Sequence, residues 1–176
     1  MSRDSSFKVL FAGLPDSGKK PLIEKLLYGK ISKRHNKTKT LEYHKAKVKY
    51  LQDVFTLTFI DLPTENTERY LNEKYIDDID LLVCVISKSQ LSKKRKNLVD
   101  LYWKIMDVIP SVDVLLCVNE GNRIRKGNSN ETEQIENIIK DIGADKFFRI
   151  SSSDANGALS LLKEILHYAK LKYSTV

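Results

Sequence analysis

Apolar residues occur along this chain in short blocks that follow different spacings. Continuous runs, which are typical of strands buried on both faces of a sheet, occupy residues 7–12, 81–86 and 112–118. Residues 41–51 and 54–60 alternate between apolar and polar on either side of a turn at Gln52-Asp53, which predicts an antiparallel hairpin. Helical spacing predicts helices near residues 19–29, 89–108, 131–141 and 159–166. One further short strand is predicted at residues 147–150.

This order of elements predicts an α/β fold: a six-stranded, mostly parallel sheet with one antiparallel hairpin strand and helices on both faces. No repeat or linker interrupts it, so we expect one domain over residues 1–176 with a short tail at 172–176. Ligands of such sheets bind beyond the carboxyl ends of the strands. Gly13, Asp61, Asn119 and Ser151 each follow a predicted strand there, and their four loops are expected to form one site.

Composition narrows the class of protein. The chain has 176 residues, 41% hydrophobic and 30% charged, which predicts a soluble globular domain. No apolar run approaches the roughly 20 residues of a membrane span. Residues 1–6 do not resemble a signal peptide, Ser2 excludes myristoylation, and the last residues hold no cysteine for prenylation. We therefore expect an intracellular, cytoplasmic protein without a transmembrane segment or lipid anchor, whose Cys84 and Cys117 are buried core residues.

Positive charge is concentrated in the first part of the chain. Residues 1–50 contain 13 Lys and Arg against 4 Asp and Glu, a net charge of +9, whereas the remainder has a net charge of −2. These cations are either a solvated edge that resists aggregation or a docking surface for an acidic protein partner. Nucleic acid is the less favoured partner, since the other basic run, at 93–96, is short. The basic edge comprises Lys33, Arg34, Lys37, Lys39, Lys45, Lys47 and Lys49.

Residues 7–27 combine a strand, a loop bounded by glycines and a helix, which is the context of a phosphate-binding P-loop. Its glycines let several backbone N–H groups surround an anion, the helix adds its positive N-terminus, and the lysine after the second glycine reaches the phosphates. Lys20 stands where a Ser or Thr hydroxyl ligates Mg²⁺, and Pro21 has no N–H to donate. The candidate ligand-binding residues in this loop are Gly13, Asp16, Ser17, Gly18, Lys19 and Lys20.

The order of motifs resembles the small GTPases of the Ras superfamily over nearly the whole chain: a P-loop, a hairpin, an aspartate after the third strand, an asparagine after the fifth and a serine after the sixth. Residues 81–118 also look somewhat like the Rag/Gtr branch, whose members carry a second domain. The resemblance implies a single small-GTPase-like domain of the P-loop NTPase fold, with GTP or GDP as ligand and Mg²⁺ as cofactor.

The resemblance assigns roles around the phosphates. The family's DxxG motif reads Asp61-Leu62-Pro63-Thr64, so Asp61 is the implied partner of Mg²⁺, together with Thr38 or Thr40 as the switch threonine. Thr64 replaces the glycine whose N–H meets the γ-phosphate. Glu65 occupies the position of the catalytic, water-orienting residue, where a carboxylate is repelled by phosphate. Asp61 is equally suited to cap the turn that leaves its strand.

The resemblance also assigns the base site. The family's NKxD motif reads Asn119-Glu120-Gly121-Asn122, which keeps Asn119 but replaces the lysine and the carboxylate. Because the Asn122 amide offers one acceptor oxygen, guanine selectivity is expected to fall. Ser151-Ser152-Ser153 replaces Ser-Ala-Lys, and the N–H near Ser152 can still reach the base carbonyl. Serines before a helix are also ordinary caps.

The departures fall in separate loops and affect metal binding, γ-phosphate sensing, water positioning and base reading. We expect a degenerate, non-hydrolysing protein–protein interaction module in which GTP or GDP binding is weak and Mg²⁺ binding is lost. Two alternatives remain open at this point. One is a divergent but functional GTP-binding switch that hydrolyses GTP, and the other is a basic domain that binds nucleic acid or another polyanion.

Overall fold

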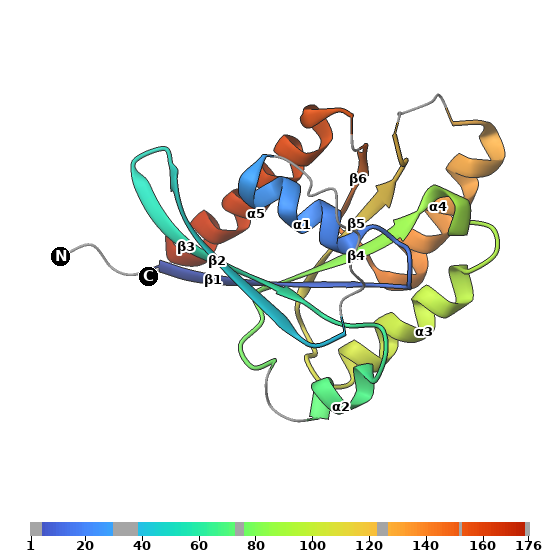
Figure 1. Ribbon diagram of the computed structural model, residues 1–176, viewed down its shortest axis with the longest axis horizontal. Coiled ribbons are helices and arrows are strands. Elements are labelled where there is room, and N and C mark those ends of the chain that lie inside the picture. The colour runs from blue at the N-terminus through green and yellow to red at the C-terminus, as the bar shows by residue number, and fades with distance from the viewer. Residues whose placement is uncertain (1–4, 30–38, 73–75, 123–126, 152, 175–176) are drawn as a thin grey trace.

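The computed structural model describes residues 5–29, 39–72, 76–122, 127–151 and 153–174, and strands and helices alternate along them as expected (Figure 1). The elements are β1 (Ser5–Gly13), α1 (Lys19–Tyr28), β2 (Glu42–Tyr50), β3 (Asp53–Asp61), α2 (Thr67–Asn72), β4 (Leu81–Ser87), the short 3₁₀ helix η1 (Lys88–Gln90), α3 (Arg95–Met106), β5 (Asp113–Asn119), α4 (Ser129–Ile142), β6 (Lys146–Ile150) and α5 (Ala155–Ser174).

The six strands form one sheet in the order β2-β3-β1-β4-β5-β6. All neighbours are parallel except β2 and β3, which confirms the predicted fold class. The hairpin turn is Leu51-Gln52 rather than Gln52-Asp53, because Asp53 pairs with Tyr50 and begins β3. Leu51 takes a φ of 57°, in the left-handed region that tight hairpin turns require.

Two apolar layers cover the sheet. On one face, α1 and α5 pack on alternate strand residues such as Phe7, Val9 and Phe11. On the other face, α2, α3 and α4 pack on the intervening residues such as Leu10 and Leu82. Figure 1 shows these two groups of helices on opposite sides of the strands. The helices therefore fix the strand ends where the site lies.

Both cysteines are buried and free, as predicted. Cys84 belongs to the layer under α2, α3 and α4, and Cys117 to the layer under α1 and α5. Burial raises the pKa of the Cys84 thiol to about 12, and burial also raises the pKa of Cys117. Both thiols are therefore protonated, unreactive core groups at neutral pH.

The helix predicted at 89–108 is divided into η1 and the shorter α3. Arg95, the first residue of α3, makes an ion pair of 2.6 Å with Asp141 of α4 and so joins these helices. Lys93, Lys94 and Lys96 are exposed, which agrees with a solvated surface. The helix predicted from residue 131 begins earlier, at Ser129, because the Asn128 side chain accepts a hydrogen bond from the backbone N–H of Glu131 and caps it.

A short tail is expected at residues 172–176, but its first three residues are helical. Residues 172–174 are the last turn of α5, where Lys172 forms an ion pair with Asp80 and the Tyr173 hydroxyl donates to the backbone carbonyl of Ser6. These contacts hold the end of α5 against Ser6 of β1 and against Asp80, which directly precedes β4. Among the helices described, none is long and apolar enough to span a lipid bilayer.

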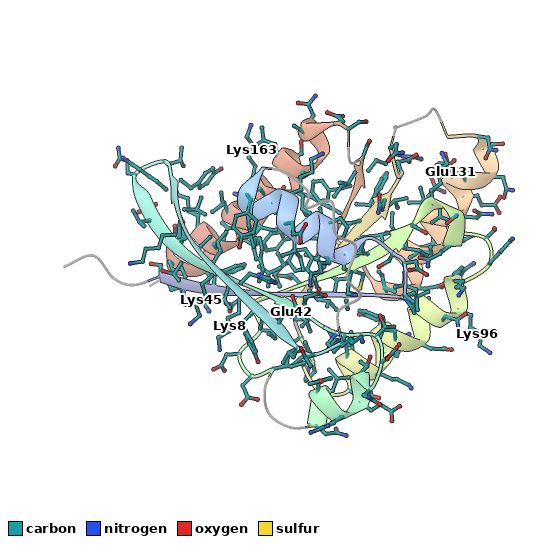
Figure 2. The ribbon with its side chains drawn as sticks, in the orientation of Figure 1. Lys8, Glu42, Lys45, Lys96, Glu131 and Lys163 are labelled. Carbon is teal, nitrogen blue, oxygen red and sulfur yellow. The ribbon has the colours of Figure 1, made fainter. Side chains whose placement is uncertain are left out.

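The edge strand β2 has one exposed and one packed side. Its exposed lysines are Lys45, Lys47 and Lys49, and Val48 and Tyr50 on the opposite side pack against the layer under α1 and α5. The register aligns Lys45 with Thr58 and then with Lys8 of β1, so Lys45 and Lys8 share one face of the sheet (Figure 2). Lys39 is exposed too, whereas Lys33, Arg34 and Lys37 lie outside the described residues.

Candidate functional site

The loop between β1 and α1 has the backbone shape of a phosphate-binding loop. Asp16 and Gly18 both adopt left-handed conformations, with φ of 62° and 89°. The Ser17 N–H donates to the carbonyl of Leu14, and α1 begins directly after Gly18. Gly13 lies so close to β4 that a Cβ atom there would be 2.4 Å from the Val85 carbonyl oxygen. Alternating left-handed residues at a helix N-terminus form an anion nest, so the backbone expected from the motif is present.

Side chains from three strand ends hold this loop by its carbonyl groups. The Thr64 hydroxyl, after β3, donates to the Gly13 carbonyl at 3.2 Å. The Gln90 amide, after β4, donates to the Pro15 carbonyl at 2.6 Å. Asn119, at the end of β5, donates from Nδ2 to the Ser17 carbonyl at 3.1 Å. The predicted convergence of loops is therefore found, and the protein itself supports the shape of the loop.

Lys19 is buried and matched by one carboxylate. Its side chain is 8% exposed, and its Nζ lies 3.6 Å from Oδ1 of the fully buried Asp61. Burial lowers the pKa of Lys19, and the charge of Asp61 opposes this shift. The residue expected to hold Mg²⁺ is thus already engaged by the lysine expected to hold phosphate.

Lys20 also forms an ion pair with a carboxylate, that of Glu42, which was not among the candidate site residues predicted from the sequence. Its Nζ donates to both carboxylate oxygens of Glu42, at 3.0 and 3.1 Å. His44 also approaches this carboxylate, with Nε2 3.5 Å from Oε2. Glu42 was detectable as the sole carboxylate between residues 25 and 52 of a basic segment, a position that invites an ion pair.

The donor set at this site does not fit Mg²⁺, which prefers oxygen ligands in octahedral geometry. Position 20 offers an ammonium group, and Asp61 and Glu42 each face a lysine. Two buried oxygens lie near the loop, the Ser17 hydroxyl and Oδ1 of Asp61, but the Asp61 oxygen lies 3.6 Å from the Lys19 ammonium, a cation in the place where a metal would have to bind. No group of three or more His, Cys, Asp or Glu side chains in the described ranges is arranged to bind a metal ion. Thr38 lies outside those ranges, and Thr40 and Glu65 are exposed.

On the base side of the site, Asn119 joins two loops. Besides donating to the Ser17 carbonyl, it accepts a hydrogen bond at Oδ1 from the backbone N–H of Gly121, at 3.0 Å. A Cβ atom on Gly18 would lie 1.9 Å from Asn119 Nδ2, so the two residues are in close contact. Asn119 therefore connects the phosphate loop to the loop that follows β5.

Glu120, at the position of the family's lysine, is part of a charged network. Its side chain is 0% exposed and binds Arg149 of β6 and, at 3.1 Å, Lys88 of η1. Glu131 of α4 binds the same two cations, at 2.9 Å to Lys88 and 2.7 Å to Arg149. Burial alone would raise the pKa of Glu131, but its hydrogen bonds to Lys88 and Arg149 outweigh this effect and lower the pKa. Glu120 therefore connects the end of β5 to η1 and to β6.

The serine turn at residues 151–153, after β6, is held by hydrogen bonds to α1 and to the loop that follows β5. The Lys25 ammonium donates to the carbonyls of Ser151 and Asp154, at 2.7 and 2.6 Å. The Ser153 hydroxyl donates to the Asn122 carbonyl, and the hydroxyls of Ser151 and Ser153 are 3.0 Å apart. Ser152, the candidate for the base carbonyl, lies outside the described residues.

A pocket with an empty volume of about 340 Å³ opens between α1 and the ends of β5 and β6. Apolar groups such as Pro21, Leu22 and Val85 line most of it, with Lys25 and Asn119 among its polar groups. A recess beside the phosphate loop is therefore retained.

Comparison with known proteins agrees with this geometry. The sequence model of the ADP-ribosylation factor (Arf) family matches residues 1–164. The match includes every strand of the sheet and both loops that meet at Asn119. No curated protein matches the chain.

Proposed function

This chain belongs to the ADP-ribosylation factor family of small GTPases, which generally bind GTP or GDP with Mg²⁺, and we propose that it is a degenerate, non-hydrolysing interaction module. It keeps the fold and the loop backbone of the family. The metal-dependent chemistry is replaced by contacts within the protein, and its surface binds a protein partner in signalling, trafficking or a larger complex.

The observation that carries this proposal is the charge balance at the phosphate loop. Lys19 and Lys20 are the two cations within the loop at 13–20, and each is paired with one carboxylate, Asp61 or Glu42. A nucleoside triphosphate is strongly anionic and is bound through surplus positive charge, which a divalent ion usually supplies. Without that surplus, the loop offers backbone N–H groups alone, and nucleotide affinity is weak.

Contacts around Thr64 support the loss of switching. In a switching GTPase, the γ-phosphate orders the segment after the DxxG motif. Here the Thr64 hydroxyl binds the Gly13 carbonyl, and the Thr67 hydroxyl binds the carbonyls of Pro63 and Thr64 at 2.9 and 3.0 Å. The segment is therefore ordered by its own side chains, and Glu65 adds a carboxylate that disfavours phosphate.

Nucleotide content tests this proposal directly. Protein purified under native conditions is denatured, and the released nucleotide is identified and quantified by chromatography. We expect far less than one nucleotide per chain, and a fluorescent GTP analogue should bind with an affinity that chelating Mg²⁺ does not change. One GDP or GTP per chain, lost on chelation, would establish the divergent switch in its place.

A variant with restored family residues is the matched comparison. Lys20→Ser with Pro21→Ala supplies the hydroxyl and the missing N–H, and it also releases Glu42. If the rest of the site can still bind nucleotide, affinity for the GTP analogue should become dependent on Mg²⁺. Asn122→Asp in the same background should increase the preference for GTP over ATP, because it restores a bidentate acceptor.

The proposed docking surface is the basic edge. Lys45, Lys47 and Lys49 are exposed on a strand that no other described strand covers on its outer side. Lysines on a strand edge favour an acidic partner, and electrostatic steering makes the association rate fall with rising salt.

A pull-down from native extract compares two charge reversals. The first changes Lys45, Lys47 and Lys49 to Glu, and the control changes the equally exposed Lys93, Lys94 and Lys96. We expect the partner to be lost with the first variant alone and to be retained with GTP, GDP or no nucleotide. Equal capture by both variants, at matching circular dichroism, would eliminate this edge as the interface. Capture of nucleic acid in place of protein would favour the polyanion-binding alternative.

A further inference from the structure

Four charged groups form a compact set where α1 meets the hairpin. Lys19 and Lys20 are consecutive at the start of α1, and Glu42 and Asp61 lie directly opposite each other on β2 and β3. Each lysine pairs with one of these carboxylates. Carboxylates opposite each other on neighbouring strands repel, and the two lysines remove that repulsion.

A divalent cation supplies two positive charges at one point, and here two ammonium groups supply the same charge at two points. Position 20 holds a metal-binding hydroxyl in the family motif, whereas Lys20 of this chain contributes one of the two positive charges. The Lys20 contact uses both oxygens of Glu42, whose side chain is only 29% exposed, so the carboxylate is held in one orientation. This arrangement accounts for the misfit with Mg²⁺.

We infer that the Lys20–Glu42 pair stands in for the metal ion as a link between the phosphate loop and β2, and fixes the start of this edge strand whether or not nucleotide is present. The inference rests on the proposed function, because it explains how the basic edge is presented without a metal. Lys20 and Glu42 are positioning residues: they act on Lys45, Lys47 and Lys49 through the strand that carries them. Figure 2 labels Glu42 and Lys45, which both belong to this strand.

The fold gives this link a particular importance. In the described sheet, β2 is hydrogen-bonded to β3 alone, with no strand on its outer side. Glu42 is the first residue of β2, and Lys20 belongs to the first turn of α1, directly after the phosphate loop. Loss of the pair should therefore loosen the start of β2 more than its end, where Val48 and Tyr50 pack on the core.

Hydrogen–deuterium exchange of the full chain tests the link. The variants are Lys20→Met, Glu42→Gln and the exchanged pair Lys20→Glu with Glu42→Lys. We expect each single variant to speed exchange at the amides of residues 42–46 by roughly fivefold, as for loss of one partly exposed ion pair. The exchanged pair should return these rates to within about twofold of the wild type, since it restores the attraction.

Two comparisons keep the result specific. Lys146→Met removes an ion pair of 2.7 Å with Glu164 at the opposite edge of the sheet and should leave residues 42–46 unchanged. Exchange in the buried strand β5 reports global stability and should change little in every variant. Unchanged exchange at residues 42–46 in the single variants, or no recovery in the exchanged pair, would overturn the inference.

Magnesium itself provides the second measurement. With the pair intact, adding MgCl₂ should leave the exchange rates of residues 42–46 and the melting temperature unchanged relative to the same ionic strength of NaCl. Protection of these amides by Mg²⁺ would show that the metal still forms the link and would overturn the inference. Failure of the proposed function is detected by a different measurement, because it would appear as one nucleotide per chain in the purified protein, whatever the exchange rates are.

Discussion

The phosphate half and the base half of the site differ in how they use charge. The phosphate half comprises the loop at 13–20 with Glu42 and Asp61. It contains two separate ion pairs. The base half, built around Asn119–Asn122 and the serine turn, instead buries Glu120 in a network of four charges. In both halves, residues that depart from the family pattern have partners inside the protein, as Lys20, Thr64 and Glu120 show. We conclude that the departures are part of the fold, and that restoring a family residue should disrupt it.

The largest expected effect concerns the contact that joins the two halves. Gly18→Ala would place a Cβ 1.9 Å from Asn119 Nδ2 at a φ of 89°. We expect a loss of about 3 kcal/mol in the free energy of unfolding, measured with urea. Gly143→Ala is the control, because its φ of 58° is also left-handed but an added Cβ would meet no other part of the described structure within 4 Å; it should cost about 1 kcal/mol. Equal losses would show that the halves do not depend on this contact.

Next in size is the return of the family's lysine to the base half. Glu120→Lys places a third cation beside Arg149 and Lys88, and we expect it to destabilise the fold by about 2 to 3 kcal/mol. Glu120→Gln keeps the shape and part of the hydrogen bonding, so it should cost about 1 to 1.5 kcal/mol. The measurement is urea unfolding at neutral pH. A stabilising Glu120→Lys would mean that the network is incidental.

A smaller effect is expected from returning the family's glycine to the phosphate half. Thr64→Gly removes the hydrogen bond to the Gly13 carbonyl and adds backbone freedom, which together should cost about 1.5 kcal/mol. Thr64→Ser keeps the hydroxyl and should cost less than about 0.5 kcal/mol. Both are read from thermal unfolding. If the two variants are equally stable, the hydroxyl contact does not order this segment.

The smallest expected effect is acid sensitivity of the base half. Because the folded pKa of Glu131 is lowered below its ordinary value of 4.5, its ion pairs stabilise the protein above that pH and are lost as pH falls through the folded pKa. The stability difference between wild type and Glu131→Gln should be within about 1 kcal/mol near pH 7 and should shrink as the pH falls below 4.5. Urea titrations across this range measure it. A difference independent of pH would assign the effect of the substitution to packing.

Much of the fold was predictable from the sequence because apolar periodicity is a local property. Runs such as 81–86 and the alternation at 41–51 identified the buried strands and the hairpin correctly. The division of the expected helix at 89–108 was not predicted, and the Gln90 side chain in η1 contacts the carbonyl of Pro15, 75 residues away in sequence. The convergence of Gly13, Asp61, Asn119 and Ser151 followed from topology alone.

By itself, the sequence determined which chemical groups this site contains: the glycines of the loop, the lysine in place of a hydroxyl, the glutamate in place of a lysine. Only the tertiary structure decided what those groups bind. Lys20 meets Glu42 across 22 residues of sequence, and Glu120 meets Arg149 across 29. The physical reason is that ion pairing depends on distance in space and on burial, and both are set by how the helices pack on the sheet.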